Sequence, residues 1–319
     1  MSDAALVTSA ASSLSHARHR REGVAPAFRF AWSNYLFILP ALGMFLTFSI
    51  YPFGLMSYLS LHEWDGITPQ MTFVGLRNFT DVLLHDPTWW TSFGNAAFIT
   101  LLALTVQNAL ALALAMAVSS NIRRGATAYR VIYYLPPILS GIVVGLVWGW
   151  IYDGNFGILN KGLELMGLGK LSRAWLDDPK TALASVAVIH MWKGFGWGFI
   201  ILSAGLQNIP QELYEAAKVD GAGPWERFWY VTVPLMMPVF FLVSILTILG
   251  TMQIFEVILA TTNGGPGFHT AVPVIWILKW MFGSSRFGYA CAMGLMFGLL
   301  LLAVSLVQMR VSAWIAQRT

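Results

Sequence analysis

The sequence predicts an all-α membrane protein with six transmembrane helices and both termini in the cytoplasm. Hydrophobic residues make up 57% of its 319 residues and charged residues only 11%, a balance typical of membrane proteins. Six stretches almost free of charge are each long enough to cross a bilayer as a helix. This composition excludes a soluble domain, and a net charge of only +4 gives nucleic-acid binding little support.

Polar segments rich in charged and turn-forming residues separate the six predicted spans. The spans cover about residues 32–61, 88–122, 131–152, 181–206, 231–260 and 288–308. The third contains Pro136-Pro137, which a membrane helix tolerates only where neighbours or water bond the carbonyls that proline leaves free. The apolar segment 271–283 is too short to span and carries Lys279, so we expect an interfacial helix in an outer loop.

The two ends of the chain and its basic residues set the predicted orientation. Residues 1–30 are rich in Ala, Ser and Arg without an apolar core, so we expect a basic, disordered cytoplasmic tail before a membrane domain at 31–319. With both termini inside, eleven basic residues fall in inner segments against seven in outer ones. Because cytoplasmic loops carry the excess of Lys and Arg, the segment between the fourth and fifth spans faces the cytoplasm.

That segment, residues 208–234, is polar and interrupts the apolar sequence. Pro210 suits the first position of a helix that Gly221 ends by taking a positive φ, and Pro224 suits the first position of a second helix. The pattern predicts a helix, a glycine turn and a second helix. From these residues alone, an amphipathic surface hairpin is as good an interpretation as a docking element.

Four residues of the fourth span share one helix face. His190, Lys193, Gly194 and Trp197 stand at i, i+3, i+4 and i+7. A lysine at membrane depth costs about 2.5–3.5 kcal/mol on insertion scales, which favours a position beside water or a polar ligand. The alternative is that Lys193 snorkels to the outer interface while His190 packs as a hydrogen-bonded residue.

Other polar residues in the spans are candidates for the lining of a cavity. Thr247 and Thr251 share one face of the fifth span, and Gln253 and Glu256 share another. Threonines in membrane helices commonly bond their own backbone instead. Asn108, together with Gln107 in the second span, either lines a cavity or bonds a neighbouring helix.

The sequence predicts neither catalytic nor metal-binding residues. Gly169-Lys170 lacks the upstream glycine and the following Ser or Thr of a phosphate-binding loop, and a His-Glu-x-x-His motif is absent. A single cysteine, Cys291, excludes intramolecular disulfides and cysteine-clustered metal sites. Either the energy source lies outside the chain, or the chain is an ion- or proton-coupled secondary transporter that uses Lys193 and Glu256.

The polar segment also carries a more specific pattern. Glu215-Ala216-Ala217 is followed after three residues by Gly221, after nine more by Val231, and after one more by Val233-Pro234. This pattern resembles the EAA loop of permease subunits in bacterial type I ABC importers, with Val where Ile and Leu are usual. Further short sequences resemble permeases of the carbohydrate-uptake branch, such as those for maltose and glycerol 3-phosphate, at residues 73–79, 134–137, 206–210, 262–266 and 288–292.

The resemblance implies the type I ABC importer permease fold in the bacterial cytoplasmic (inner) membrane, in contact with lipid. It implies a second homologous permease subunit, two copies of a cytoplasmic ABC ATPase, an extracytoplasmic solute-binding protein and a sugar substrate. No cofactor is expected in this chain, because ATP and Mg²⁺ would be bound by the ATPase. The chain would then form half of a translocation pathway that works by alternating access.

The resemblance also implies roles for particular residues. Those that would dock on the ATPase are Glu212, Glu215, Ala216, Ala217, Asp220, Gly221 and Arg227. Those that would line the substrate pathway are His190, Lys193, Gly194, Trp197, Thr247, Thr251 and Ile254. Further candidates for the pathway are Asn108, Gln253 and Glu256.

Overall fold

The computed structural model describes residues 32–121 and 126–316, which belong to two compact units, residues 1–53 and 54–319. In the smaller unit, α2 (Trp32–Phe45) leads through the π-helical turn η1 (Leu46–Ile50) into α3 (Tyr51–Leu59), which continues into the larger unit. Pro40 lies inside α2. The predicted tail at residues 1–30 lies outside the described residues.

In the described part of the larger unit, the regular secondary structure is helical apart from a two-stranded antiparallel ribbon, β1 (His62–Glu63) with β2 (Thr72–Phe73). Its first helical elements are α4 (Arg77–His85), α5 (Pro87–Leu102), η2 (Ala103–Gln107), α6 (Asn108–Asn121), α7 (Ala126–Ile138), α8 (Gly141–Ile151), α9 (Ile158–Leu165) and η3 (Gly169–Leu171). The remaining ones are α10 (Ala182–Gln207), α11 (Gln211–Val219), α12 (Pro224–Arg227), η4 (Phe228–Thr232), α13 (Val233–Met252), α14 (Glu256–Thr261), α15 (Pro273–Leu278), η5 (Lys279–Gly283) and α16 (Phe287–Ala316).

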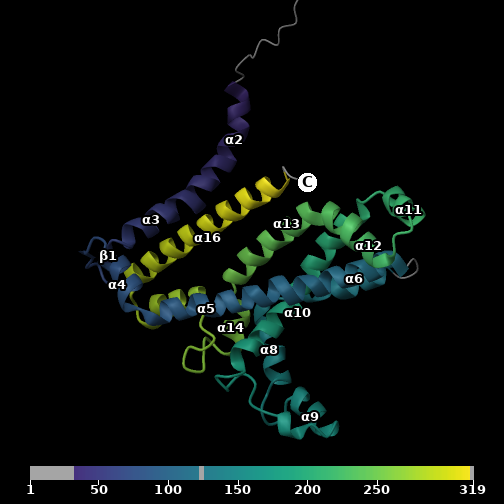
Figure 1. Ribbon diagram of the computed structural model, residues 1–319. Helices are drawn as coiled ribbons and strands as arrows, with labels where there is room; N and C mark the ends of the chain where they lie inside the picture. Colours follow the sequence, from purple (N-terminus) through teal and green to yellow (C-terminus); the bar gives the residue numbers. More distant parts are fainter. Residues whose placement is uncertain (1–31, 122–125, 317–319) are drawn as a thin grey trace, which may run out of the picture. The chain divides into compact units, whose positions relative to one another are not determined.

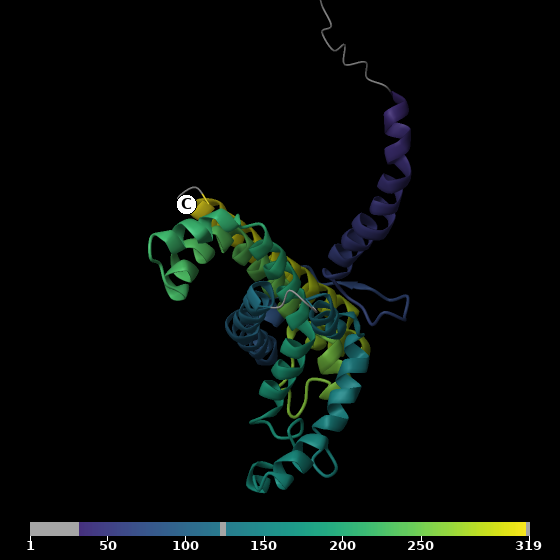
Figure 2. The same ribbon diagram turned by 90° about the vertical axis from the view of Figure 1, so that its right-hand side faces the viewer.

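Within residues 32–121 and 126–316, five helices are long and apolar enough to cross a membrane, and a bent helix pair makes six if it is counted as one span. The five are Leu36–Leu59, Pro87–Val118, Ala182–Gln207, Pro224–Thr261 and Phe287–Trp314. Their positions agree with the spans predicted from the sequence. Within the larger unit, α11, α12 and the last turns of α16 lie at one end, and α9 lies far from them (Figures 1 and 2).

The third predicted span is not one continuous helix, as expected for 131–152, but α7 and α8 joined at a bend of 101°. Pro136 and Pro137 lack the N–H groups that would bond the carbonyls four residues earlier, and the chain leaves the helix at Ser140 with an extended ψ of 137°. The carbonyl of Tyr133 instead lies against Gly196 of α10, where an added Cβ would contact it. Helix α7 therefore packs closely against α10 next to the bend.

The fifth predicted span, 231–260, is also interrupted. Helix α13 ends at Met252 and α14 begins at Glu256, so that residues 253–255 break the regular helix. In membrane proteins such irregular backbone occurs where it is buried in protein or lines a cavity.

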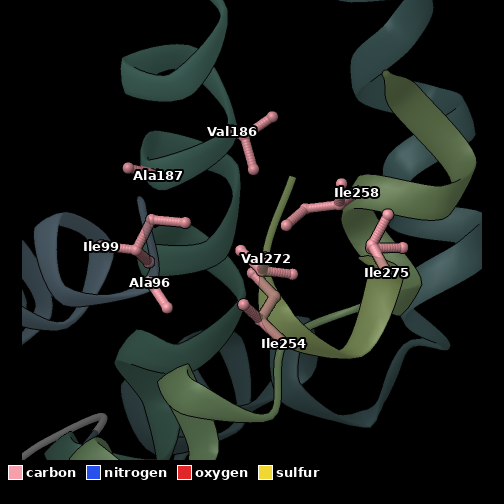
Figure 3. Close-up of a cluster of buried hydrophobic side chains, with 8 residues drawn as sticks. All are labelled: Ala96, Ile99, Val186, Ala187, Ile254, Ile258, Val272 and Ile275. Carbon is pink, nitrogen blue, oxygen red and sulfur yellow. The ribbon is translucent and has the colours of Figure 1, made fainter. Parts of the chain in front are cut away.

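The core is built around α10, which contacts α5, α6, α7, α8, α13 and α14. Small residues let these helices approach: a Cβ at Gly198 would lie 3.4 Å from Ala111, and one at Gly205 would lie 3.0 Å from the sulfur of Met236. One buried cluster joins Ala96 and Ile99 of α5, Val186 and Ala187 of α10 and four residues from the far end of the chain (Figure 3). Those four are Ile254, Ile258, Val272 and Ile275.

A buried carboxylate joins three helices at the start of α5. Asp86 accepts hydrogen bonds from the Trp89 backbone N–H at 3.0 Å, the Trp276 indole N–H at 2.8 Å and the Tyr289 hydroxyl at 3.1 Å. Trp276 belongs to α15 and Tyr289 to α16, so the charge of Asp86 is satisfied by donors from α5, α15 and α16.

Replacing Asp86 with Ala should destabilise the fold, because it removes the common acceptor and leaves buried donors unpaired. We expect the free energy of unfolding to fall by about 3 kcal/mol or more, against about 1.5–3 kcal/mol for Tyr289→Phe, which removes one bond to the charge. Thermal unfolding in detergent measures both changes. Asp177→Ala, at an exposed site, is the control, and equal midpoints for the Asp86 and Asp177 variants would contradict the role of Asp86.

Candidate functional site

A cavity of about 480 Å³ opens between α10, α13, the break at 253–255 and the start of α8. Its volume is within the range of small-molecule sites in proteins. Apolar residues form most of its wall. The polar side chains in the wall are Gln107, His190, Lys193, Thr247, Thr251, Gln253 and Glu256.

The α10 wall contains the four residues that the sequence places on one face. His190, Lys193, Gly194 and Trp197 all line the cavity. The Trp197 side chain is 55% exposed. Its ring contacts the ring of Tyr134 edge-on, with 5.5 Å between the centroids, and this contact restricts the rotation of the indole. The absence of a side chain at Gly194 leaves room for the amide of Gln107, whose Oε1 would lie 3.1 Å from an added Cβ.

The α13 wall is held by hydroxyl and amide bonds to the second span. Thr251 is buried and shares a hydrogen bond of 2.7 Å with Thr100, and it also donates to the Thr247 carbonyl at 2.8 Å. Asn108 donates to the Thr247 hydroxyl at 3.2 Å. Both threonines line the cavity, whereas Asn108 is not among the lining residues and acts as the helix-bonding residue of the two alternatives.

The break after α13 positions the remaining predicted residues. Gln253 donates to the Leu249 carbonyl at 3.1 Å, and Ile254 reaches both the cavity and the buried cluster of Figure 3. Glu256 accepts a hydrogen bond of 2.8 Å from the backbone N–H of Gly141, the first residue of α8. An added Cβ at Gly141 would contact the Glu256 carboxylate, so only glycine allows this approach.

Gln107, for which the sequence left open a cavity-lining or a helix-bonding role, lines the cavity. It ends the π-helical turn η2, is 6% exposed, and its amide oxygen is buried without a hydrogen-bond partner. A π-helical turn within a membrane helix often marks a functional position, but sequence periodicity does not reveal it. A glutamine among apolar residues was the available signal.

The polar segment forms the predicted helix, glycine turn and helix. Gly221 has φ of +84°, the Ala222 N–H bonds the Ala217 carbonyl at 2.9 Å, and the Gly221 N–H bonds the Lys218 carbonyl at 3.1 Å. This pair of bonds is a Schellman motif, which ends α11 at the glycine. Pro224 is the first residue of α12 as predicted, but Pro210 precedes α11 instead of opening it.

Most of the predicted docking residues are accessible. Glu212, Glu215, Ala216, Asp220 and Gly221 are exposed, and Ala217 and Arg227 are partly buried. Glu215 accepts a hydrogen bond of 2.9 Å from the Gln211 side chain one turn earlier. Both acids of α11, Glu212 and Glu215, are therefore accessible to solvent.

Tyr214 and Thr232 form a hydrogen bond that was not predicted from the sequence. Their hydroxyls lie 2.9 Å apart and connect α11 to the π-helical turn η4, beside a cavity of about 770 Å³ under the two short helices. Thr232 is buried. From there the helix continues without a break through α13 to the cavity that contains Lys193.

Residues 107–319 match the family of binding-protein-dependent transport system inner membrane components. The chain belongs to this family. It is 34% identical to the probable ABC transporter permease protein YurN of Bacillus subtilis, over 86% of this chain and 94% of that protein. It is 31% identical to the trehalose/maltose transport system permease protein MalF of Thermococcus litoralis, over 89% of this chain and 95% of that protein.

The structural comparison agrees with this family. The fold is similar to a permease chain in the crystal structure of a bacterial ABC transporter involved in the import of the acidic polysaccharide alginate. The TM-score is 0.77 over 89% of this chain and 96% of that chain, at 22% identity, which supports the fold alone. The predicted type I importer permease fold is confirmed.

Family membership settles the class of protein. The chain is a multi-pass inner-membrane subunit of an ABC importer and is not an enzyme, since the ATPase of such importers is a separate chain. The ion-coupled secondary transporter finds no support. Lys193 and Glu256 line one cavity, but none of the ion pairs found among the described residues joins them.

Gly141→Ala should displace Glu256 from the start of α8, because the added methyl group would occupy the position of the carboxylate. We expect a lower thermal midpoint and reduced uptake, measured on the purified complex and in proteoliposomes. Gly149→Ala on the same helix is the control, since nothing lies within 4 Å of its added Cβ and alanine favours helix by about 0.8–1.0 kcal/mol. Identical behaviour of the two variants would show that the Gly141 contact is unimportant.

Proposed function

We propose that this chain forms half of the translocation pathway of an ATP-driven sugar importer that works by alternating access. One observation carries the proposal: a continuous helix from Pro224 to Met252 begins with α12 and ends in the wall of the cavity. It is bonded to α11 through Thr232 and Tyr214. A movement imposed on α11 and α12 therefore reaches Thr247 and Thr251 through a single rod. Several relatives are named for sugar transport, among them MalF and the diacetylchitobiose uptake permease NgcF of Streptomyces coelicolor.

The partners follow from the family. A second homologous permease completes the pathway, two copies of a cytoplasmic ATPase bind ATP and Mg²⁺, and an extracytoplasmic binding protein delivers the sugar. Both termini and the segment 208–234 lie in the cytoplasm, in accord with the distribution of basic residues. The ATPase docks on the exposed side of α11, where Glu212, Glu215 and Asp220 carry negative charge.

The sugar lies in the cavity of about 480 Å³. Trp197 offers an exposed aromatic face on which the apolar side of a sugar ring can stack. The polar side chains around it supply hydrogen bonds to hydroxyl groups, and His190, Gly194, Thr247, Thr251 and Ile254 complete the walls. Gln253 and Glu256 line the end of the cavity at the break in the fifth span.

Glu215→Ala tests the docking site. The variant should reduce uptake and transport-coupled ATP hydrolysis by about tenfold, the loss expected when about 1.4 kcal/mol of docking energy is removed. Sugar binding by the isolated binding protein should not change. The control is Glu164→Ala, which replaces an exposed acid on α9. Equal uptake by the Glu215 variant and the control would contradict the proposed docking role.

Tyr214→Phe and Thr232→Val test the connection between α11 and the rod, because each removes a hydroxyl and little volume. We expect fewer sugar molecules imported per ATP hydrolysed, with the ATPase still bound. The double variant should be no worse than either single one, since both remove the same hydrogen bond. An unchanged ratio of uptake to hydrolysis would show that the bond does not transmit the movement.

A further inference from the structure

We propose that the sugar carried through the cavity bears an anionic group, a carboxylate or a phosphate, and that Lys193 is its counter-charge. This inference rests on the proposed function and adds the chemical class of the substrate. It is carried by three features of the cavity wall: an ammonium group without an ion-pair partner among the described residues, an acid that is already engaged, and an aromatic surface suited to a sugar.

Lys193 lies well inside α10. It is eleven positions beyond Ala182, where the helix begins, or about 16 Å along the axis. It is partly buried and lines the cavity. In the ranges 32–121 and 126–316, none of the observed ion pairs or side-chain hydrogen bonds involves its ammonium group. A lysine at this depth needs water or an anion, and the cavity supplies the space for either.

Glu256, the acid in the same wall, does not serve as this anion. Its carboxylate accepts the backbone N–H of Gly141 at 2.8 Å, at the first residue of α8. The carboxylate thus lies at the N-terminus of α8, where negative charge is favourable. Glu256 is already engaged by this backbone N–H, and His190, one turn before Lys193, adds no negative charge.

The rest of the wall fits a saccharide rather than a simple anion. Trp197 is 55% exposed and is held edge-on by Tyr134, so it presents a fixed apolar face. Gln107 lines the same wall, and its buried amide oxygen has no hydrogen-bond partner among the described residues. A ring stacked on the indole could then place its acidic group at the ammonium, one helical turn away.

The test uses the complete reconstituted transporter with its binding protein and pairs of related sugars. Galacturonate is compared with galactose, glucuronate with glucose, digalacturonate with maltose, and glucose 6-phosphate with glucose. Uptake and binding to the purified membrane complex are measured for each pair. The wild type should favour the anionic member, and the uronate and phosphate arms show which acidic group is used.

Lys193→Met should weaken binding of the anionic sugar roughly 30-fold or more, the loss expected when one partner of a desolvated charge pair is removed. Lys193→Arg, which keeps the charge, should restore most of the affinity. Trp197→Ala is the matched control on the same face, and it should weaken anionic and neutral sugars alike. Copurification of the ATPase and the second permease verifies that each variant assembles.

Two results would overturn the inference and leave the proposed function standing. One is ATP-dependent uptake of a neutral sugar in preference to its acid, with no effect of Lys193→Met. The other is a loss of assembly or an equal loss for both members of a pair in Lys193→Met, which would assign the lysine to an acid of the second permease. Absence of ATP-dependent uptake for every sugar would instead overturn the proposed function, and the inference with it.

Discussion

Close packing on α10 is the constraint on which the rest of the larger unit depends. Within a bilayer, helices gain little by hiding apolar surface from one another, so association relies on close contact and on hydrogen bonds. Glycine supplies that contact here: Gly196 meets the Tyr133 carbonyl, Gly198 meets Ala111, and Gly205 meets Met236. The same helix turns Lys193 and Trp197 toward the cavity. Glycines on different sides of α10 therefore pack three helices against it, while Gly194 lies at the cavity.

The helical periodicity of the sequence was sufficient to predict much of the cavity wall. The spacing of His190, Lys193, Gly194 and Trp197 placed them on one face, and the cavity contains all four. Gly221 was predicted to turn the chain because few other residues adopt a positive φ, and its φ is +84°. These features depend on local geometry, which short sequences encode.

The features that escaped prediction depend on residues far apart in the chain. Thr100 bonds Thr251, and Tyr214 bonds Thr232, and neither pair follows from the pattern of its own helix. The two prolines at 136 and 137 signalled an irregular third span, but the angle of its bend also reflects packing on α10. The sequence did not decide between the two roles considered for Gln107, because a π-helical turn shifts the face on which a side chain lies.

The hydrogen bonds to Asp86 and the glycine contacts of α10 differ in how they resist movement of the helices. Rotating α16 against α5 would break hydrogen bonds to a buried charge, whereas sliding a helix along the glycines of α10 breaks only van der Waals contacts. The ends of α5, α15 and α16 that meet at Asp86 therefore form a rigid pivot. Shear is easiest along α10, the helix that carries the proposed counter-charge for the substrate, so a change in packing there also changes the cavity.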